Sequence, residues 1–191
     1  MRYVTWSWHD ENQSQHKDQV HLFDIKNPTT PSPLYPDAKN QLAPFISDGK
    51  IYSGTVSKDV TDGWDVWIYD IEDQKMSWLD HSPYDQIAGH ADGHIVAYLD
   101  TEELKSYYYQ NGMKAHVEIQ DLETHLTRQI TIVDDNYFGI AVSGKYLVFG
   151  VHIGNDVLVV CDLEAGGFID KAGHVMPEGA IPDAGADGGN G

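Results

Sequence analysis

Three carboxylates lie close together in one segment of the sequence and could bind a cation. Asp59, Asp62 and Asp65 flank a glycine in the stretch Asp-Val-Thr-Asp-Gly-Trp-Asp. Carboxylate oxygens are the ligands that Ca²⁺ prefers in proteins, although this spacing does not match the twelve-residue calcium loop. Two interpretations stay open: a Ca²⁺ site formed by these three residues, and a solvated loop between two strands.

The ten histidines do not form a metal-binding motif in the sequence. His90 and His94 are four residues apart, but Asp92-Gly93 between them predicts a turn rather than the helix on which zinc ligands have this spacing. Six histidines would meet only if the fold brought them to one channel: His9, His81, His90, His94, His116 and His152. No Gly-x-Ser-x-Gly elbow is present, and we predict no catalytic residue.

Aromatic residues are the second group with binding chemistry. Trp6 and Trp8 are two residues apart and therefore share one face of a predicted strand. Tyr107, Tyr108 and Tyr109 form a cluster inside a long predicted loop. Since aromatic rings with a polar edge are enriched at interfaces, we predict that these five residues contact a protein or a carbohydrate. The contact loops are expected at residues 10–17, 59–64 and 101–114.

The elements that position these residues recur along the chain. Four times a short β-rich run is followed by Asp and then by Ile or Leu, and the Asp residues are Asp24, Asp70, Asp121 and Asp162. The spacings of 46, 51 and 41 residues indicate a repeated unit of strands in a radial or stacked arrangement. We expect each repeated Asp to accept hydrogen bonds from backbone N–H groups of the following turn.

Two stretches of the repeat resemble those of a known family. Trp64-Asp65-Val66-Trp67-Ile68-Tyr69-Asp70-Ile71 and Gly154-Asn155-Asp156-Val157, with Ser-Asp-Gly or Ser-Gly before the second strand of a unit, resemble the TolB-like β-propellers. The resemblance covers about residues 2–170 and implies four-stranded blades around a central channel. It also implies the activities of that family: protein-binding scaffolds, domains that gate substrates beside a peptidase and, occasionally, polysaccharide lyases that use His and a charged partner beside a metal.

The predicted fold is an all-β propeller of four-stranded antiparallel blades, with about four blade equivalents that form part of a larger ring. The blades are expected at residues 1–36, which hold a partial first blade, and at 37–82, 83–133 and 134–170. A flexible low-complexity tail is expected at 171–191, because Asp, Ala and Gly bury little apolar surface. The alternative is a closed four-bladed ring, in which the segment near Glu178 pairs with residues 2–8.

The composition of the chain limits the kinds of partner that it can bind. The chain has 30 Asp and Glu against 12 Lys and Arg, a net charge of −18, which repels nucleic-acid phosphates and anionic lipids. No apolar stretch has the length of a membrane helix, so we predict neither nucleic-acid binding nor membrane insertion. The Asp-Ala-Gly tract of the tail resembles linkers of bacterial envelope proteins, which favours a periplasmic or extracellular location.

We therefore predict a non-catalytic scaffold for protein–protein interaction. Its partner would be another protein or further propeller blades, and it would need no cofactor unless the carboxylates described above bind Ca²⁺. The alternative is a carbohydrate-binding or polysaccharide-lyase-type propeller that uses His and Tyr residues of the channel.

Overall fold

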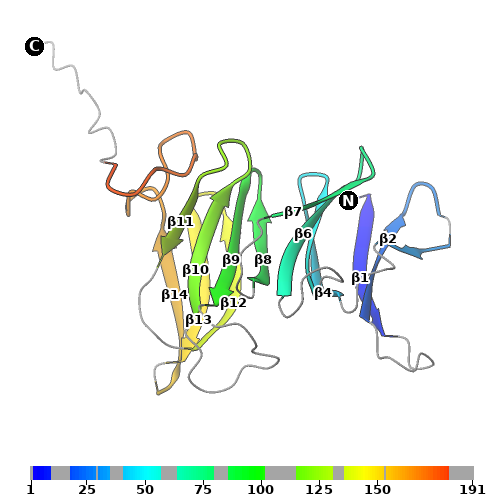
Figure 1. Cartoon of the computed structure of the whole chain (residues 1–191), viewed down its shortest axis with the longest axis horizontal. Helices are drawn as coiled ribbons and strands as arrows, with labels where there is room; N and C mark the ends of the chain where they lie inside the picture. The colour runs from blue at the N-terminus through cyan, green and yellow to red at the C-terminus, as the bar shows by residue number, and fades with distance from the viewer. Residues whose placement is uncertain are drawn as a thin grey trace, which may run out of the picture.

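Four antiparallel sheets make up the part of the chain that the structure describes. The computed structural model describes residues 2–9, 18–28, 30–34, 41–56, 64–79, 86–101, 115–130, 136–152 and 154–180. Within these ranges the chain forms strands and turns but no helix (Figure 1), and hence no helix long and apolar enough to cross a bilayer. The predicted all-β class is confirmed.

Each sheet is one blade, and consecutive strands are neighbours in the sheet. The first blade contains β1 (Tyr3–His9), β2 (Asp18–Asp24) and β3 (Ser32–Pro33). The second contains β4 (Gln41–Ser47), β5 (Lys50–Val56), β6 (Trp64–Asp70) and β7 (Lys75–Trp78). The third contains β8 (Gln86–Asp92), β9 (Ile95–Thr101), β10 (Ala115–Asp121) and β11 (Thr127–Ile130). The fourth contains β12 (Asn136–Ser143), β13 (Tyr146–His152) and β14 (Asp156–Asp162).

The hairpin turns have the geometry that their sequences predict. Between β4 and β5, Asp48 and Gly49 both have positive φ, 43° and 73°, which is the conformation that a primed hairpin turn requires and that Asp-Gly tolerates. Gly93 and Gly144 adopt positive φ at the equivalent turns of the third and fourth blades. These tight turns bring each strand back beside the one before it.

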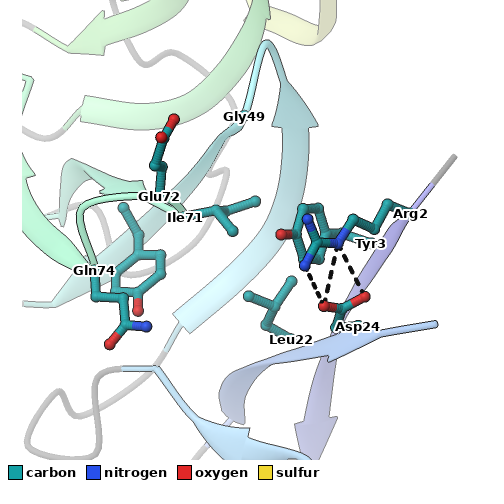
Figure 2. A pocket seen from close by; sticks show the side chains of 9 residues that line it. Arg2, Tyr3, Leu22, Asp24, Gly49, Ile71, Glu72 and Gln74 are labelled. Atoms are coloured by element: carbon teal, nitrogen blue, oxygen red, sulfur yellow. Dashed lines mark hydrogen bonds and ion pairs between the residues drawn. The ribbon is translucent and has the colours of Figure 1, made fainter. Parts of the chain in front are cut away.

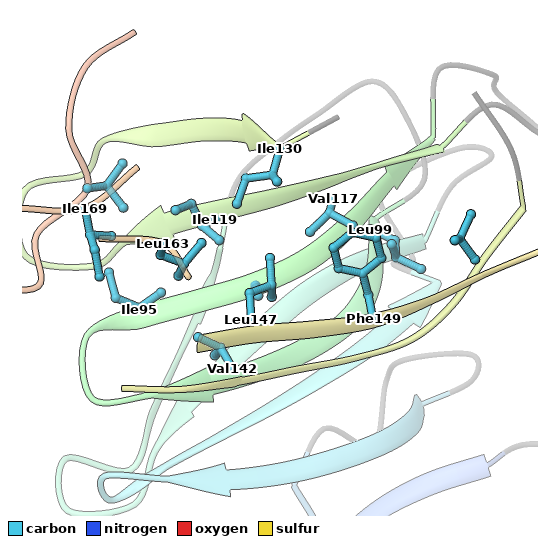
Figure 3. Close-up of a cluster of buried hydrophobic side chains, with 13 residues drawn as sticks. Ile95, Leu99, Val117, Ile119, Ile130, Val142, Leu147, Phe149, Leu163 and Ile169 are labelled. Carbon is cyan, nitrogen blue, oxygen red and sulfur yellow. The ribbon is translucent and has the colours of Figure 1, made fainter. Parts of the chain in front are cut away.

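The blades stack face to face because their strands alternate apolar residues on both sides. In β6, Val66 and Ile68 pack with the third blade, whereas Trp67, between them in sequence, packs with Val20 of the first blade. A third core lies between the third and fourth blades and includes Ile119 of β10, as Figure 3 shows. Successive strand residues point to opposite faces, so one strand contributes to two cores.

The four blades form an arc. The first and the fourth blade lie at opposite ends of the molecule in Figure 1, and the described residues of β1 pair only with β2. Residues 178–180 lie at the end of the arc that carries the fourth blade (Figure 1). The alternative in which this segment pairs with residues 2–8 is therefore wrong for the residues that the structure describes.

The segment that follows β14 belongs to the folded part of the chain as far as residue 180. Ile169 forms a bridge with Val175, the Met176 N–H donates to the Phe168 carbonyl, and Val175 is 3% exposed. The last blade was expected to end at residue 170 and a flexible tail to begin at residue 171. In the structure, Val175 nevertheless belongs to the third core. Residues 181–191 lie outside the described residues.

Candidate functional sites

The repeated Asp of each blade holds the turn that follows it. Asp70 Oδ1 accepts hydrogen bonds from the N–H groups of Glu72 and Asp73, each at 3.0 Å, and Lys50 Nζ lies 3.1 Å from Asp70 Oδ2. These contacts hold the pKa of Asp70 below its usual value, the N–H of Asp73 being the largest cause. We call this arrangement of carboxylate, turn N–H groups and cation the turn clamp. It confirms the predicted structural role of the repeated Asp.

The first and fourth blades have the same turn clamp. Arg2 Nη2 lies 2.8 Å from Asp24 Oδ2, and Asp24 Oδ1 accepts the N–H of Lys26 at 2.9 Å. Lys145 Nζ lies 3.0 Å from Asp162 Oδ2. The Arg2 guanidinium lowers the pKa of Asp24 well below its usual range. The recurring partner of the carboxylate in these clamps is a Lys or Arg side chain, which is positively charged at neutral pH.

The turn clamp of the third blade contains histidines instead. Asp121 Oδ1 accepts the N–H groups of Glu123 at 2.8 Å and Thr124 at 3.2 Å, and its Oδ2 lies 3.0 Å from Nδ1 of His174. Burial by itself raises the pKa of Asp121, but these hydrogen bonds outweigh it and lower the pKa to about 2. His94 completes the group, with its ring centroid 4.7 Å from that of His174. Reasoning from sequence missed this cluster.

A pocket of about 670 Å³ lies between the first two blades (Figure 2). Its lining residues are Arg2, Tyr3, Leu22, Asp24, Gly49, Tyr69, Ile71, Glu72 and Gln74. The Arg2 guanidinium is already engaged by both oxygens of Asp24 and lies 4.8 Å from the Tyr3 ring centroid. The described lining residues offer hydroxyl, amide, carboxylate and guanidinium groups. Such groups can form hydrogen bonds with a polar ligand.

The two predicted tryptophans lie together on the first blade. Trp6 stacks on His21 with ring centroids 5.6 Å apart, and Trp8 lies 6.4 Å from the same ring at a tilt of 57°. Trp8 is 57% exposed. Val20 and Leu22 of β2 pack with the second blade, so Trp6, Trp8 and His21 lie on the opposite face of the sheet.

The outward face of the fourth blade is apolar as well. Leu158 and Val160 of β14 are 70% and 62% exposed. Val159, between them in sequence, packs against the core shared with the third blade. Tyr146 of β13 is 49% exposed and lies opposite Asp162 in the strand register, on the same side of the sheet as Leu158 and Val160. Both ends of the arc thus present apolar sheet faces.

The remaining predicted site residues are only partly placed. Asp65 lies in β6 and is buried, 1% exposed, whereas Asp59 and Asp62 lie outside the described residues. The Ca²⁺ site therefore stays a prediction. Tyr107, Tyr108 and Tyr109 also lie outside the described residues.

The histidines described by the structure are dispersed over several blades. His90 lies against Phe45, with ring centroids 3.8 Å apart, and its Nδ1 accepts the N–H of Val142 at 3.3 Å. His94 and His174 lie at the turn clamp of the third blade, and His21 lies beneath the tryptophans of the first. Among the described residues the predicted histidines do not gather at one place.

The fold is that of a TolB-like β-propeller. TolB from Acinetobacter baumannii superposes with a TM-score of 0.61 at 12% sequence identity, over 86% of this chain and 40% of that chain. Puromycin hydrolase superposes with a TM-score of 0.64 at 14% identity, over 86% of this chain and 26% of that chain. The oligogalacturonate lyase in complex with manganese has a TM-score of 0.53 at 9% identity, over 85% of this chain and 58% of that chain.

The three similar structures include a hydrolase and a lyase, so the shared fold alone does not define an activity. No protein-family model matches the sequence, and no curated protein matches it. The chain spans less than two thirds of the length of each structure named above. Function must therefore be argued from the surfaces of this chain.

Proposed function

We propose that this chain is a non-catalytic propeller scaffold that binds a further β-sheet, such as another propeller blade, through the apolar outer faces of its end blades. The observation that carries the proposal is the exposure of Leu158 and Val160, at 70% and 62%. Exposed apolar patches of contiguous residues mark interaction sites.

Continuity with the internal interfaces supports a sheet as the occupant. Every interface between neighbouring blades is formed by alternate apolar residues of facing strands, as with Val20 of β2 and Trp67 of β6. The outer faces repeat this alternation without a facing sheet among the described residues. A partner that offers an equivalent sheet would bury Tyr146, Leu158 and Val160 in the way that blades bury each other.

The net charge of the chain favours some partners over others. The net charge of −18 opposes the approach of a second copy of the chain at low ionic strength and favours a partner with a basic rim. Salt screens exposed charges but does not weaken apolar contact. Self-association that increases with salt therefore reports on the apolar faces alone.

Sedimentation velocity at low and high salt tests the proposal. We expect the wild-type chain to associate as salt is raised, and the double variant Leu158→Lys, Val160→Lys to remain monomeric with an unchanged melting temperature. The matched control is Val157→Lys on the opposite side of β14, which should retain association. A wild-type chain that stays monomeric at all salt concentrations, or a double variant that associates like the wild type, would contradict the proposal.

One observation favours a second candidate, a carbohydrate-binding propeller. Trp6 and Trp8 lie around His21 on one sheet face, and flat aromatic surfaces can stack on sugar rings. Titration calorimetry with oligogalacturonides, using wild type and Trp8→Ala, tests this alternative. Binding that is lost in Trp8→Ala would support carbohydrate recognition. A separate assay follows the absorbance of unsaturated products; if such products form and a chelator suppresses them, the non-catalytic proposal is contradicted.

A further inference from the structure

The third blade replaces the cation of the turn clamp by residues that can bind a metal. In the fourth blade the N–H of Leu163, the residue after the repeated Asp, donates to the Lys145 carbonyl at 2.8 Å. In the third blade the N–H of Leu122, which also follows the repeated Asp, donates to the His94 carbonyl at the same distance. His94 therefore occupies the backbone position of Lys145. Lysine and arginine have no lone pair available at neutral pH, whereas neutral imidazole has one.

Three potential ligands converge at this clamp from distant parts of the chain. One ring nitrogen of His94, one of His174 and one carboxylate oxygen of Asp121 all lie within 4.8 Å of one another. His174 Nδ1 and Asp121 Oδ2 lie 3.0 Å apart. In a tetrahedral site with bonds of about 2.0–2.1 Å, ligand atoms lie roughly 3.3 Å apart. The pair His174 and Asp121 is therefore already close to this separation, and the ligand atom of His94 lies within 4.8 Å of both.

The carboxylate of this cluster is held in place before any ion arrives. Asp121 is fully buried, and its two oxygens accept the N–H groups of Glu123, Thr124 and Val175 at 2.8, 3.2 and 3.2 Å. These bonds fix the side chain from two segments, the turn after β10 and the C-terminal segment. A ligand fixed in this way loses little conformational freedom when it binds an ion.

We propose that His94, Asp121 and His174 bind a divalent transition-metal ion, Zn²⁺ by the chemistry of the three ligands. Two imidazole nitrogens and one carboxylate oxygen suit Zn²⁺, whereas Ca²⁺ and Mg²⁺ select sets of oxygen ligands. The ion takes the place that an ammonium or guanidinium group has in the other clamps. His174 Nδ1 releases its proton to solvent when the metal binds. The His174 side chain is 34% exposed, so water can reach a fourth ligand position.

Such an ion would fasten the C-terminal segment to the third blade. His174 follows the turn at Gly173, whose carbonyl lies 3.2 Å from His94 Nε2, and precedes Val175, which is buried in the third core. Arg128 of β11 holds the same segment through the carbonyls of Gly167 and Met176. A metal bound between His94 and His174 would add a link between the turn before β9 and a segment about 80 residues further along the chain.

Isothermal titration with Zn²⁺ tests the site, on protein without a histidine tag. We expect one Zn²⁺ ion per wild-type chain, a visible absorption band with Co²⁺ as the probe, and a higher melting temperature with Zn²⁺. His94→Lys recreates the clamp of the fourth blade and should fold while it loses Zn²⁺ binding. His174→Gln should also weaken Zn²⁺ binding. The loss of affinity should exceed the roughly 10–100-fold that follows when only a hydrogen-bond partner of a metal ligand is removed.

The matched control is His125→Asn, three residues after Leu122 in the same turn. His125 has a φ of 59°, which Asn tolerates, and it is not part of the cluster; this variant should bind Zn²⁺ like the wild type. Absence of Zn²⁺ binding by the wild-type chain would overturn the proposal. So would equal Zn²⁺ affinity of wild type, His94→Lys and His174→Gln, since the ion would then be held by other residues.

Discussion

The interfaces between blades and the outer faces of the two end blades have similar residues but opposite exposures. Trp67 of β6 is fully buried between the first and second blades, whereas Trp8 of β1 is 57% exposed. Val66 is fully buried, whereas Val160 of β14 is 62% exposed. Both kinds of face are made by the same alternation of apolar residues along strands. The comparison shows that the presence of a facing sheet, rather than the composition of a strand, decides whether its apolar residues are buried.

The largest effect expected from this comparison is that of Trp67→Ala. Removal of a fully buried indole leaves a cavity and should lower the free energy of unfolding by about 3–5 kcal/mol. Trp8→Ala is the matched variant on an outer face and should cost less than about 1 kcal/mol. Urea denaturation followed by circular dichroism measures both values. Equal losses in the two variants would mean that the outer face is as well packed as the interface.

A smaller effect is expected from Tyr52, which is buried between the second and third blades. Burial, helped by the nearby carboxylates of Asp48 and Asp70, raises the pKa of Tyr52 to about 12. The unfolded chain binds this phenolic proton less tightly, with a pKa of about 10. The resulting stabilisation is complete below about pH 10 and is lost as the pH rises towards 12, with a total of at most about 3 kcal/mol.

Tyr52→Phe tests this pH dependence. Among the described residues the Tyr52 hydroxyl has no hydrogen-bond partner, so the substitution should cost little at pH 7. Denaturation curves at several pH values between 7 and 11 should then show a smaller alkaline loss of stability in the variant than in the wild type. Parallel curves for the two proteins would show that Tyr52 is not buried as described.

The smallest effect is expected at the turn clamp of the second blade, which lies at the surface. Lys50→Met removes the cation beside Asp70, and both side chains are partly exposed, at 38% and 30%. Exposed ion pairs contribute about 0.2–1 kcal/mol, and salt weakens them. The melting temperature of the variant should therefore approach that of the wild type in concentrated salt. A loss that persists in salt would show that Lys50 acts through packing.

Local features of the fold could be predicted from the sequence. The hairpin at Asp48-Gly49 and the capping role of Asp70 depend on residues close together in sequence, and both are confirmed. The burial of Trp67 follows from its place in a strand of a repeated unit. The Ca²⁺ site and the tyrosine cluster stay predictions because Asp59, Asp62 and the three tyrosines lie outside the described residues.

The histidine cluster could not be predicted in the same way. His174 is 53 residues from Asp121 and lies in a segment without a strand pattern, which the sequence analysis assigned to a flexible tail. One signal was available: aligning the turns of the repeat places His94 where the fourth blade has Lys145. That exchange indicates a different clamp in the third blade, although it does not identify the second histidine.

The sequence by itself determined the strands, the turns and the repeated carboxylate that caps each turn, because these depend on interactions among neighbouring residues. Only the tertiary structure decided which sheet faces are covered and that His94, Asp121 and His174 meet. Burial and side-chain clustering depend on elements far apart along the chain, and their contacts form only when the blades stack.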